Sequence, residues 1–567
     1  MRLTSPGVSY PSCEPAFLET DILSGRERFM PSRVFIRPDN LQAGERSKQV
    51  TAFTVFIAIL LLVIGSGLFV VIGKQREKAI PKRPSAALPV AEDKTRLDRH
   101  WQSIRNGWSE KNALCLLHSN LDAFAVRVAA ARAAGRSLDL MYYMWNADLT
   151  GRLMMREVIA AADRGVRVRL LLDDLGVSIS DRIFHAIDSH PNIELRLFNP
   201  TRARENILYR SLELILRFRS VNRRMHNKAW IADGRALIVG GRNIGDAYFD
   251  AAERANFHDF DVLGFGRIVT DATEIFDDYW NSAVSVPVRS LLARRPSKLA
   301  RLRRELDALP QSEAAKPYLE RVESQYGSGH FLMSDRLHWV DTADVLADPP
   351  EKAAGKRRKG HNFLMESLLP LMQAASESLH ITSPYFIPGK QGVDIFLDLA
   401  ERGVSVAILT NSLAATDVAA VHAGYARYRK PLLLGGVNLH ELRSQADQGS
   451  FTLRGSGQAS LHTKAFTRDG KTGYIGSLNF DPRSASLNTE MGVVFNSAPL
   501  VARMDEIFSD EIRRMMSFEL GMDNDNRLLW MTEEQGQPKI YRREPDAAIS
   551  RRIIAGIMRI LPLESQL

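Results

Sequence analysis

The sequence predicts an α/β protein built from two similar halves, each with a mixed β-sheet. Three observations support this prediction: the length of the chain, an internal duplication, and apolar patterns typical of strands and helices. With 567 residues the chain exceeds the size of one ordinary hydrophobic core, so two globular units are expected. Hydrophobic residues make up 45% of the chain and charged residues 25%, proportions typical of a globular protein.

The charge and cysteine content narrow the possible functions. A net charge of +9 and a pI near 9.4 suggest an anionic partner, either nucleic acid or an acidic lipid surface. The same charge is also explained by solubility and by basic residues that flank a membrane segment. Only two cysteines occur, Cys13 and Cys115, which excludes a disulfide framework and a cysteine-rich metal site.

Residues 49–73 form an uncharged apolar run near the N-terminus. In a helix this run is long enough to cross a hydrocarbon core of about 30 Å. It lacks the features of a cleaved signal peptide, so we expect a retained membrane anchor; a buried core helix is the alternative. Residues 1–48 are expected to be largely unstructured, and residues 74–98 to be a linker rich in proline and charge.

The orientation of this anchor is weakly specified, because basic residues flank it on both sides. A short segment before a first transmembrane helix commonly stays in the cytosol. We therefore expect the protein in the cell membrane, with the part that follows the anchor outside the cytosol.

The rest of the chain contains the same pattern twice. "SLDLMYYMW" and "SLHITSPYF" are strand-like stretches, and "RGVRVRLLLDD" and "RGVSVAILTN" each follow a helical stretch. A third pair of similar stretches, described below, begins near His226 and His462. In the three pairs Ser137 corresponds to Ser378, Arg164 to Arg402, and His226 to His462. The offset is nearly constant, as a duplication requires. The repeated order of strand, helix, strand and hairpin predicts α/β layers with a mixed sheet in each half.

The third pair of stretches reads His-x-Lys-x4-Asp-x6-Gly-(Gly/Ser)-x-Asn in both copies. Its residues are His226, Lys228, Asp233, Gly240, Gly241 and Asn243, then His462, Lys464, Asp469, Gly476, Ser477 and Asn479. Histidine and lysine two apart on a strand share one face, and Asp-Gly is a strong hairpin signal. We therefore expect both aspartates at turns, away from their histidines and mainly structural. An imidazole beside an ammonium suits a phosphate, because the lysine binds the oxygens while the histidine attacks phosphorus.

Each histidine also needs a carboxylate that fixes its tautomer. The first half offers Asp259, with Asp261 as a rival, and the second half offers Glu490. Each of these precedes a predicted final strand downstream of the histidine of its own half. We therefore expect Asp259 to serve His226 and Glu490 to serve His462.

Further segments are candidates for contact with the substrate or with a membrane. Gly241, Ser477, Tyr143 and Tyr385 lie near the predicted site, although core packing is the commoner role of such aromatic residues. Residues 206–224 space apolar residues among arginines, which is typical of a helix on a bilayer or of an ordinary surface helix. The predicted amphipathic helix at 546–567 aligns isoleucines on one stripe, for which docking onto the protein is favoured over membrane contact.

The duplicated motifs resemble the two HKD motifs of the phospholipase D superfamily. Residues 111–567 resemble its cardiolipin synthase branch, particularly in "RMHNKAWIADGRALIVGGRNIGDAYFD" and "GSLNFDPRSASLNTEMGVV". The resemblance implies two pseudo-symmetric halves, at 99–330 and 331–545, packed around one central site without a metal or cofactor. One departure is Phe257-His258-Asp259, where the family usually has aromatic-Arg-Asp.

The resemblance also implies a mechanism. His226 attacks the phosphorus of a phospholipid and His462 protonates the leaving alcohol, while other motif residues hold the phosphate oxygens: Lys228, Lys464, Asn243 and Asn479. Transfer of the resulting phosphatidyl group to phosphatidylglycerol makes cardiolipin, and transfer to water makes phosphatidic acid. The expected partners are phospholipids and a membrane, not nucleic acid. A nuclease of the same superfamily and an inactive membrane scaffold are the remaining alternatives.

Overall fold

The computed structural model describes residues 84–560 except 106, 108–110, 205–206, 254, 293–295, 327–330 and 445–458, together with short pieces between 53 and 71. The chain divides into two units, Met1–Leu61 and Leu62–Leu567, and the second contains both halves. Within the part of the chain just defined, no helix is long and apolar enough to cross a membrane. Outside it lie residues 1–48, parts of the predicted anchor, residues 74–83 of the predicted linker, and residues 561–567.

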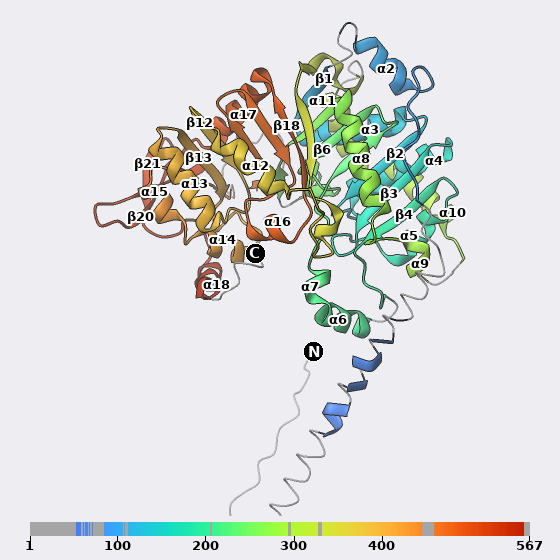
Figure 1. The fold of residues 1–567 in the computed structure, drawn as a ribbon, viewed down its shortest axis with the longest axis horizontal. Coiled ribbons are helices and arrows are strands. Elements are labelled where there is room, and N and C mark those ends of the chain that lie inside the picture. Colours follow the sequence, from blue (N-terminus) through green and yellow to red (C-terminus); the bar gives the residue numbers. More distant parts are fainter. Residues whose placement is uncertain are drawn as a thin grey trace, which may run out of the picture. The chain divides into compact units, whose positions relative to one another are not determined.

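The first half is built on a nine-stranded mixed sheet, sheet 1, drawn mainly in blue to green in Figure 1. In spatial order its strands are β10 (His338–Val340), β1 (Asn112–Leu117), β8 (Asp261–Phe265), β6 (Ala236–Gly240), β5 (Ala229–Ala232), β2 (Ser137–Tyr142), β3 (Arg167–Asp173), β4 (Ile193–Phe198) and β9 (Ser285–Pro287). Strands β2, β3 and β4 are parallel, and the other neighbours are antiparallel.

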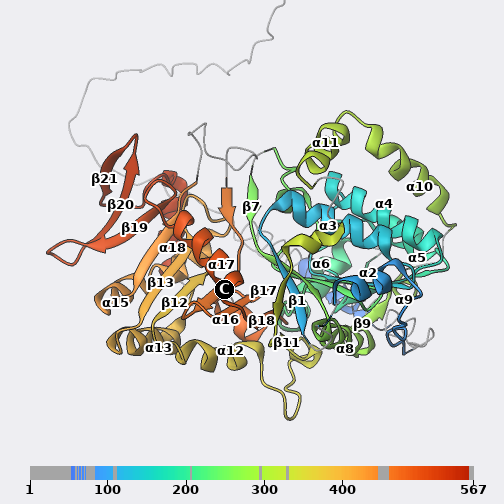
Figure 2. The same ribbon diagram turned by 90° about the horizontal axis from the view of Figure 1, so that it is seen from above.

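The second half repeats this plan in a ten-stranded mixed sheet, sheet 2 (Figure 2). In spatial order its strands are β11 (Ala343–Ala347), β18 (Met491–Asn496), β17 (Thr472–Gly476), β16 (Ala465–Arg468), β12 (Ser378–Thr382), β13 (Ser405–Asn411), β14 (Asn438–Leu442), β19 (Ser517–Met522), β20 (Leu528–Glu534) and β21 (Gln537–Tyr541). From β11 to β14 the order and directions match those from β1 to β4 in sheet 1. The predicted fold class of two similar α/β halves with mixed sheets is confirmed.

Helices connect the strands and pack on the sheets. In the first half they are α2 (Arg96–Ile104), α3 (Asn120–Ala133), α4 (Leu149–Asp163), α5 (Asp181–Asp188), α6 (Ile207–Leu216), α7 (Phe218–Val221), α8 (Arg267–Asn281), α9 (Val288–Leu291), α10 (Leu299–Ala308) and α11 (Ala315–Tyr326). In the second half they are α12 (Leu364–Gln373), α13 (Gly389–Glu401), α14 (Ala419–Tyr425), α15 (Arg429–Leu434), α16 (Pro482–Ser486), α17 (Ala498–Glu511) and α18 (Ile549–Ile560). Short 3-10 helices are η1 (Asp246–Tyr248), η2 (Leu309–Gln311), η3 (Phe331–Arg336) and η4 (Pro350–Lys352).

The repeated Arg-Gly-Val landmark ends a helix in the same way in both halves. Gly165 follows α4 with φ 95°, and Gly403 follows α13 with φ 84°. In this left-handed conformation the backbone N–H of each glycine, and of the valine after it, donates to carbonyl groups in the last helical turn. The chain then reverses into β3 or β13, so the glycine sets where each parallel strand begins.

The motif aspartates hold the hairpins of the two halves. Asp233 and Asp469 lie at positive φ in the β5–β6 and β16–β17 turns, each followed by a glycine that is also at positive φ. The Asp233 carboxylate accepts from the backbone N–H groups of residues 135–137, at the start of β2. The Asp469 carboxylate accepts from those of residues 376–378, at the start of β12. Each aspartate therefore ties a hairpin to the first parallel strand of its sheet, β2 or β12.

The two halves share a hydrophobic core and backbone pairing. Apolar side chains of sheet 1 and α8 pack in one cluster with those of β17, β18 and α17. The short strand β7 (Asn256–His258) of the first half pairs in parallel with β15 (Ala459–Leu461) of the second half. Met225 forms a matching bridge with Thr489. These contacts bring the segments that carry the two histidines against the opposite half.

Candidate active site

His226 lies in the extended segment just before β5, and residues of the second half hold it. Its backbone N–H donates to the Thr489 carbonyl oxygen at 2.8 Å. Its Nδ1 lies 2.9 Å from Glu490 Oε2 and 3.1 Å from the Ser477 carbonyl oxygen. Because acceptors face Nδ1, this nitrogen carries the proton and Nε2 keeps its lone pair.

His462 lies in the equivalent segment before β16, and residues of the first half hold it. Its backbone N–H donates to the His258 carbonyl oxygen at 2.8 Å, and its Nδ1 lies 2.6 Å from Asp259 Oδ2. The arrangement repeats that of His226, with Asp259 in the role of Glu490. Each imidazole is thus oriented by a carboxylate.

The expected pairing of each histidine with a carboxylate of its own half is wrong, because the structure exchanges the two partners. Asp259 and Glu490 each follow a segment that pairs with the histidine segment of the opposite half, so each carboxylate reaches the opposite imidazole. The rival Asp261 instead accepts from two buried arginines, Arg127 at 2.9 Å and Arg242 at 3.3 Å. Asp261 therefore stabilises the first half and does not contact either histidine.

The two lysines lie beside their histidines and are buried. Lys228 Nζ donates to the His226 carbonyl oxygen at 2.6 Å, and Lys464 Nζ lies 3.0 Å from His462 Nδ1. Burial lowers the pKa of Lys228 to about 7 and that of Lys464 to about 8, and the charge of Lys464 contributes to the lower value of Lys228. The lysines thus act on each other electrostatically across the halves.

The histidines and their carboxylates are buried as well. Burial lowers the pKa of His226, and burial with the nearby charge of Lys464 lowers the pKa of His462 well below its ordinary value. Burial disfavours a charged Glu490, but His226 and Lys228 outweigh it and hold the pKa of this carboxyl below its usual range. Burial raises the pKa of Asp259. Both imidazoles are therefore neutral at pH 7, as a nucleophile must be.

The motif asparagines differ in their hydrogen bonds. Asn243 donates from Nδ2 to the Tyr248 hydroxyl at 2.9 Å and accepts from the Met144 backbone N–H at 3.2 Å. Asn479 is buried, and its Oδ1 has no hydrogen-bond partner among the described residues. A buried oxygen without a partner is costly, so a polar group of a substrate that paired with it would be favoured.

Gly241 and Ser477 occupy matching positions next to the exchanged carboxylates. A Cβ atom at Gly241 would lie 2.2 Å from Asp259 Oδ1, so only glycine fits there. Ser477 is fully buried, and its hydroxyl donates to Glu490. Both residues therefore contact the carboxylates that orient the histidines.

Aromatic rings surround the two histidines. The Tyr143 ring lies 5.0 Å from the His226 ring, between centroids, in an edge-to-face arrangement. The His462 ring has two aromatic neighbours, Tyr248 edge-to-face at 5.1 Å and Phe257 tilted at 5.0 Å, and the Tyr248 hydroxyl lies 3.5 Å from Nε2. Sequence reasoning missed Tyr248, although it lies within the longer stretch shared with the family.

Tyr385 does not reproduce the contact that Tyr143 makes in the first half. Its hydroxyl donates to both carboxylate oxygens of Asp417, at 2.8 Å each. Asp417 is exposed, and its charge acts on His462 and Lys464. Asp417 is a second residue near the site that no sequence pattern indicated, because it lies in the irregular loop after β13.

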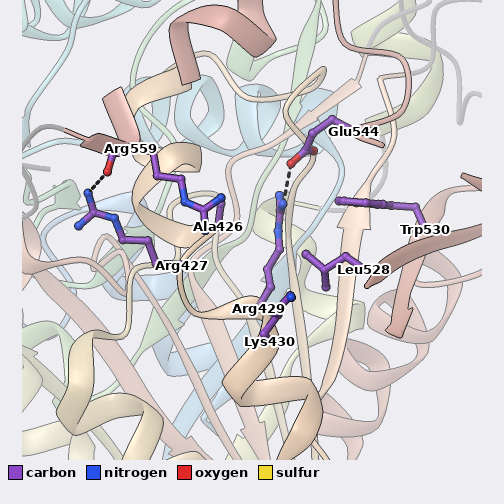
Figure 3. Close-up of a pocket in the computed structure, with 8 residues that line it drawn as sticks. All are labelled: Ala426, Arg427, Arg429, Lys430, Leu528, Trp530, Glu544 and Arg559. Atoms are coloured by element: carbon purple, nitrogen blue, oxygen red, sulfur yellow. Dashed lines mark hydrogen bonds and ion pairs between the residues drawn. The ribbon is translucent and has the colours of Figure 1, made fainter. Parts of the chain in front are cut away.

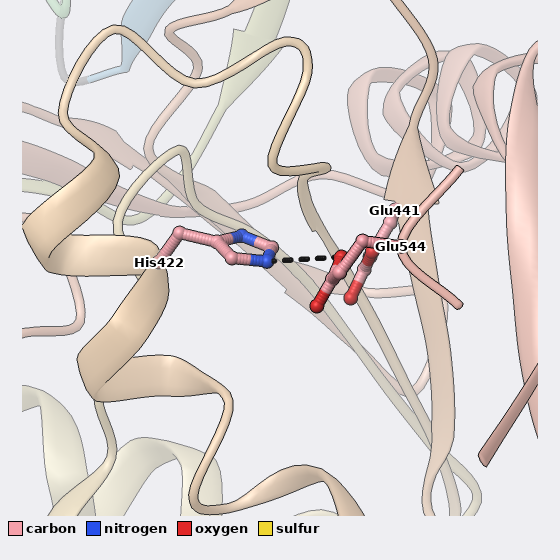
Figure 4. Close-up of side chains that lie close together, drawn as sticks. All are labelled: His422, Glu441 and Glu544. Atoms are coloured by element: carbon pink, nitrogen blue, oxygen red, sulfur yellow. Dashed lines mark ion pairs between the residues drawn. The ribbon is translucent and has the colours of Figure 1, made fainter. Parts of the chain in front are cut away.

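A second cluster of polar side chains lies away from the motifs, in the second half (Figure 4). Potential ligand atoms of His422, Glu441 and Glu544 lie within 4.8 Å of one another. The Arg429 guanidinium already occupies the space between them, at 2.9 Å from Glu441 and 2.6 Å from Glu544, and it also contacts His422. Because this cation balances the carboxylates, the cluster fits a buried ion network better than a metal site.

Comparison with known proteins agrees with this geometry. Residues 128–280 and 368–512 match the family model described as "Cardiolipin synthase, PLD-like domain". The chain is 43% identical over 454 residues to cardiolipin synthase C of Escherichia coli (strain K12), across 79% of this chain and 94% of the relative. It is 23% identical over 413 residues to a cardiolipin synthase of Listeria monocytogenes serotype 4b (strain F2365), across 73% of this chain and 71% of the relative.

Among solved structures, the fold is similar to that of phosphatidylserine synthase from Haemophilus influenzae Rd KW20. The TM-score is 0.52 at 14% sequence identity, over 82% of this chain and 100% of that chain. The two sheets and the paired motifs thus define a protein of the phospholipase D type. The family match is more specific: the chain belongs to the cardiolipin synthase family with PLD-like domains, which confirms the resemblance seen in its motifs.

Proposed function

We propose that this protein is a membrane-bound phosphatidyltransferase that forms cardiolipin by transferring a phosphatidyl group to phosphatidylglycerol. The observation that carries the proposal is the pair of buried histidine–lysine couples, each oriented by a carboxylate of the opposite half. A phosphodiester needs one nucleophile, one acid and positive charge around phosphorus, and the paired motifs supply all three. Membership of the cardiolipin synthase family supports the choice of lipid substrates.

In the first step, Nε2 of His226 attacks phosphorus and the bond from phosphorus to the leaving oxygen breaks. His462 donates the proton that the leaving alcohol requires. Burial and Lys464 lower the pKa of His462, but an anionic phosphodiester beside it has the opposite effect. Substrate binding therefore favours the protonated form of His462 that this step uses.

In the second step, the acceptor hydroxyl attacks the phosphatidyl-histidine and the phosphorus–nitrogen bond breaks. His462, now neutral, accepts the proton of the hydroxyl, and His226 is regenerated. Lys228, Lys464, Asn243 and Asn479 are proposed to hold the phosphate oxygens, where charge is concentrated in both transition states. The residues proposed for catalysis are thus those named from the motifs, with Asp259 and Glu490 as orienting carboxylates.

The aromatic rings around the histidines favour transfer to a lipid hydroxyl over hydrolysis. Tyr143, Tyr248 and Phe257 present apolar surface next to both imidazoles. Such surface makes the site less favourable for water and more favourable for a lipid acceptor. Phospholipase D activity, with phosphatidic acid as product, is the second candidate.

The direct test uses the full-length protein reconstituted in vesicles with labelled phosphatidylglycerol, alone and mixed with a second, unlabelled phospholipid. Labelled cardiolipin is the expected product, and its dependence on the second lipid identifies the donor. Phosphatidic acid as the only product would establish a hydrolase. If neither product forms, and the His226→Asn variant behaves like the wild type, the proposal is wrong.

We also propose that residues 49–73 anchor the protein in the cell membrane, with the catalytic part outside the cytosol. The uncharged apolar run and the family's lipid substrates support this proposal. Protease treatment of intact spheroplasts tests it. The domain after residue 84 should be digested without lysis, whereas digestion only after lysis would reverse the orientation.

A further inference from the structure

Two helical segments, one from each half, expose rows of large apolar side chains. On α6 and α7 these are Ile207, Leu208, Ile215, Leu216 and Phe218, and on α18 they are Ile549, Ile553, Ile554 and Ile557. The most exposed member of each row, Ile207 at 81% and Ile549 at 74%, is almost fully accessible. We call these two rows together the apolar rim. An exposed apolar surface of this kind usually marks an interaction site.

Both parts of the apolar rim are fixed to the protein by other faces of their helices. The Glu213 carboxylate of α6 is buried and accepts from the backbone N–H groups of Arg202 and Ala203 at 2.8 Å each. The Arg551 guanidinium of α18 donates to the carbonyl oxygens of Leu413 and Ala414. The expectation that the isoleucine stripe of α18 docks onto the protein is therefore wrong, because the helix packs through a different face.

The apolar rim lies at the same edge of the sheets as the candidate active site. Helix α7 ends at Val221, and Arg224, just beyond it, pairs with Asp173 at the carboxyl end of β3. Helix α18 is tied to residues 413–414, in the loop that follows β13 and continues to Asp417 near His462. Figure 1 shows α6, α7 and α18 on the lower side of the two sheets.

The helices that carry the apolar rim have a net positive charge. Glu213 is the only acidic residue in α6 and α7, and α18 has none. Arg219 and Arg552 are exposed beside the apolar rows. At the end of α18, a pocket of about 330 Å³ is lined by the basic side chains of Arg427, Lys430 and Arg559 (Figure 3). Arg429 and Glu544 also line it, and their charges are paired with each other. A surface that combines exposed aliphatic groups with basic groups fits an anionic lipid surface.

We propose that the apolar rim inserts into the interface of an anionic bilayer and so holds the catalytic edge of both sheets against the lipid from which the substrate comes. The inference rests on the proposed function for the identity of that substrate. A second copy of the chain is a poorer occupant, because a symmetric contact would place this positive rim against itself. Lipid headgroups instead supply the opposite charge, and acyl chains accept the isoleucines.

Fluorescence quenching tests the insertion directly. Tryptophan is introduced into the full-length protein as Ile215→Trp or Ile553→Trp, in vesicles of phosphatidylcholine and phosphatidylglycerol that contain brominated acyl chains. The matched control is Ile540→Trp, because Ile540 is an isoleucine of similar exposure on the edge strand β21. The signal added by the two rim tryptophans should be quenched and that of the control should not. Equal quenching at all three positions, or none, overturns the proposal.

Activity measurements separate this inference from the proposed function. The double variant Ile553→Asp/Ile557→Asp should lose about tenfold in activity on vesicles, because two charges replace apolar groups in the interface. On a short-chain phosphatidylglycerol below its micellar concentration, its activity should match that of the wild type and of Ile540→Asp. Equal losses on both substrates overturn the docking role. A wild type inactive on both substrates would instead refute the proposed function.

The oligomeric state gives the third test. Sedimentation of the detergent-solubilised wild type and of Ile553→Asp/Ile557→Asp should give the same mass. If the wild type is an oligomer that these substitutions dissociate, a second copy covers the rim and the lipid proposal is wrong.

Discussion

The two halves of the candidate site share one backbone plan but hold their histidines with different side chains. His226 is oriented by the longer Glu490, which also accepts from the Ser477 hydroxyl. His462 is oriented by the shorter Asp259, which closely approaches Gly241, the glycine that corresponds to Ser477. The side of the site with Glu490 and Ser477 therefore carries larger side chains than the side with Asp259 and Gly241.

This comparison shows how a duplicated site can become asymmetric without losing its geometry. Glutamate with serine and aspartate with glycine are two solutions for the same hydrogen bond to Nδ1. The surroundings differ more: Tyr143 flanks His226, whereas Tyr248 and Phe257 flank His462. We expect this asymmetry to assign different tasks to the two imidazoles.

The largest expected effect comes from removing either imidazole. His226→Asn and His462→Asn should each lower turnover by about 10⁴-fold or more, because the paired residues act as a unit. A phosphatidyl donor with a p-nitrophenol leaving group, which needs no proton from an acid, should distinguish the effects of the two substitutions. His462→Asn should then still form the covalent lipid adduct, seen by mass spectrometry on the peptide that contains residue 226. An adduct on His462 in the His226→Asn variant would reverse the assigned roles.

Removing the charge of either orienting carboxylate should have the next largest effect. Glu490→Gln and Asp259→Asn should each lower kcat by about 100-fold or more, since an amide neither fixes the tautomer nor stabilises an imidazolium. With the p-nitrophenol donor, Glu490→Gln should slow adduct formation, whereas Asp259→Asn should mainly slow the later attack by the acceptor. Pre-steady-state release of p-nitrophenol measures the first step. The same slow step in both variants would contradict the asymmetry.

The lysines predict the pH dependence. Lys228, with a pKa of about 7, and Lys464, with a pKa of about 8, lose their protons as the pH rises through these values. The positive charge that binds phosphate is lost with them, so kcat/KM should fall by about tenfold per pH unit between the two values and by up to about a hundredfold per unit above both. Lys228→Arg keeps its charge and should move the falling limb to higher pH. If kcat/KM of this variant falls over the same pH range as that of the wild type, Lys228 does not cause the fall.

The smallest expected effect compares the matching glycine and serine. Gly241→Ala should displace Asp259 and cost about 2 kcal/mol or more of stability, because its Cβ has no space. Ser477→Ala removes only a hydroxyl and should cost about 1 kcal/mol. Chemical denaturation measures both values. The activity of Gly241→Ala should likewise fall more than that of Ser477→Ala. If Ser477→Ala loses more stability and activity than Gly241→Ala, the short distance between residue 241 and Asp259 does not restrict residue 241 to glycine.

Much of the fold follows from local sequence patterns. The Asp-Gly turns, the glycines after α4 and α13, and the apolar strands each depend on neighbours in the sequence, and the duplication shows that the two halves share them. The histidine–lysine couples could be identified for the same reason.

The exchange of Asp259 and Glu490 could not be predicted from spacing, because it depends on how the halves pack. A carboxylate close in sequence is the natural expectation, and only the pairing of β7 with β15 shows the correct one. Tyr248 and Asp417 were missed because Tyr248 ends the short 3-10 helix η1 and Asp417 lies in an irregular loop, and neither segment has a periodic pattern. The isoleucine stripe of α18 was misassigned because amphipathicity alone does not say what covers an apolar face.

The crossed carboxylates have a consequence for the history of the chain. Neither half orients its own histidine, so an isolated half has no oriented imidazole unless a second copy supplies the carboxylate. Fusion in one chain fixes the partner of each half, so the two copies can diverge in sequence while each still completes the site of the other.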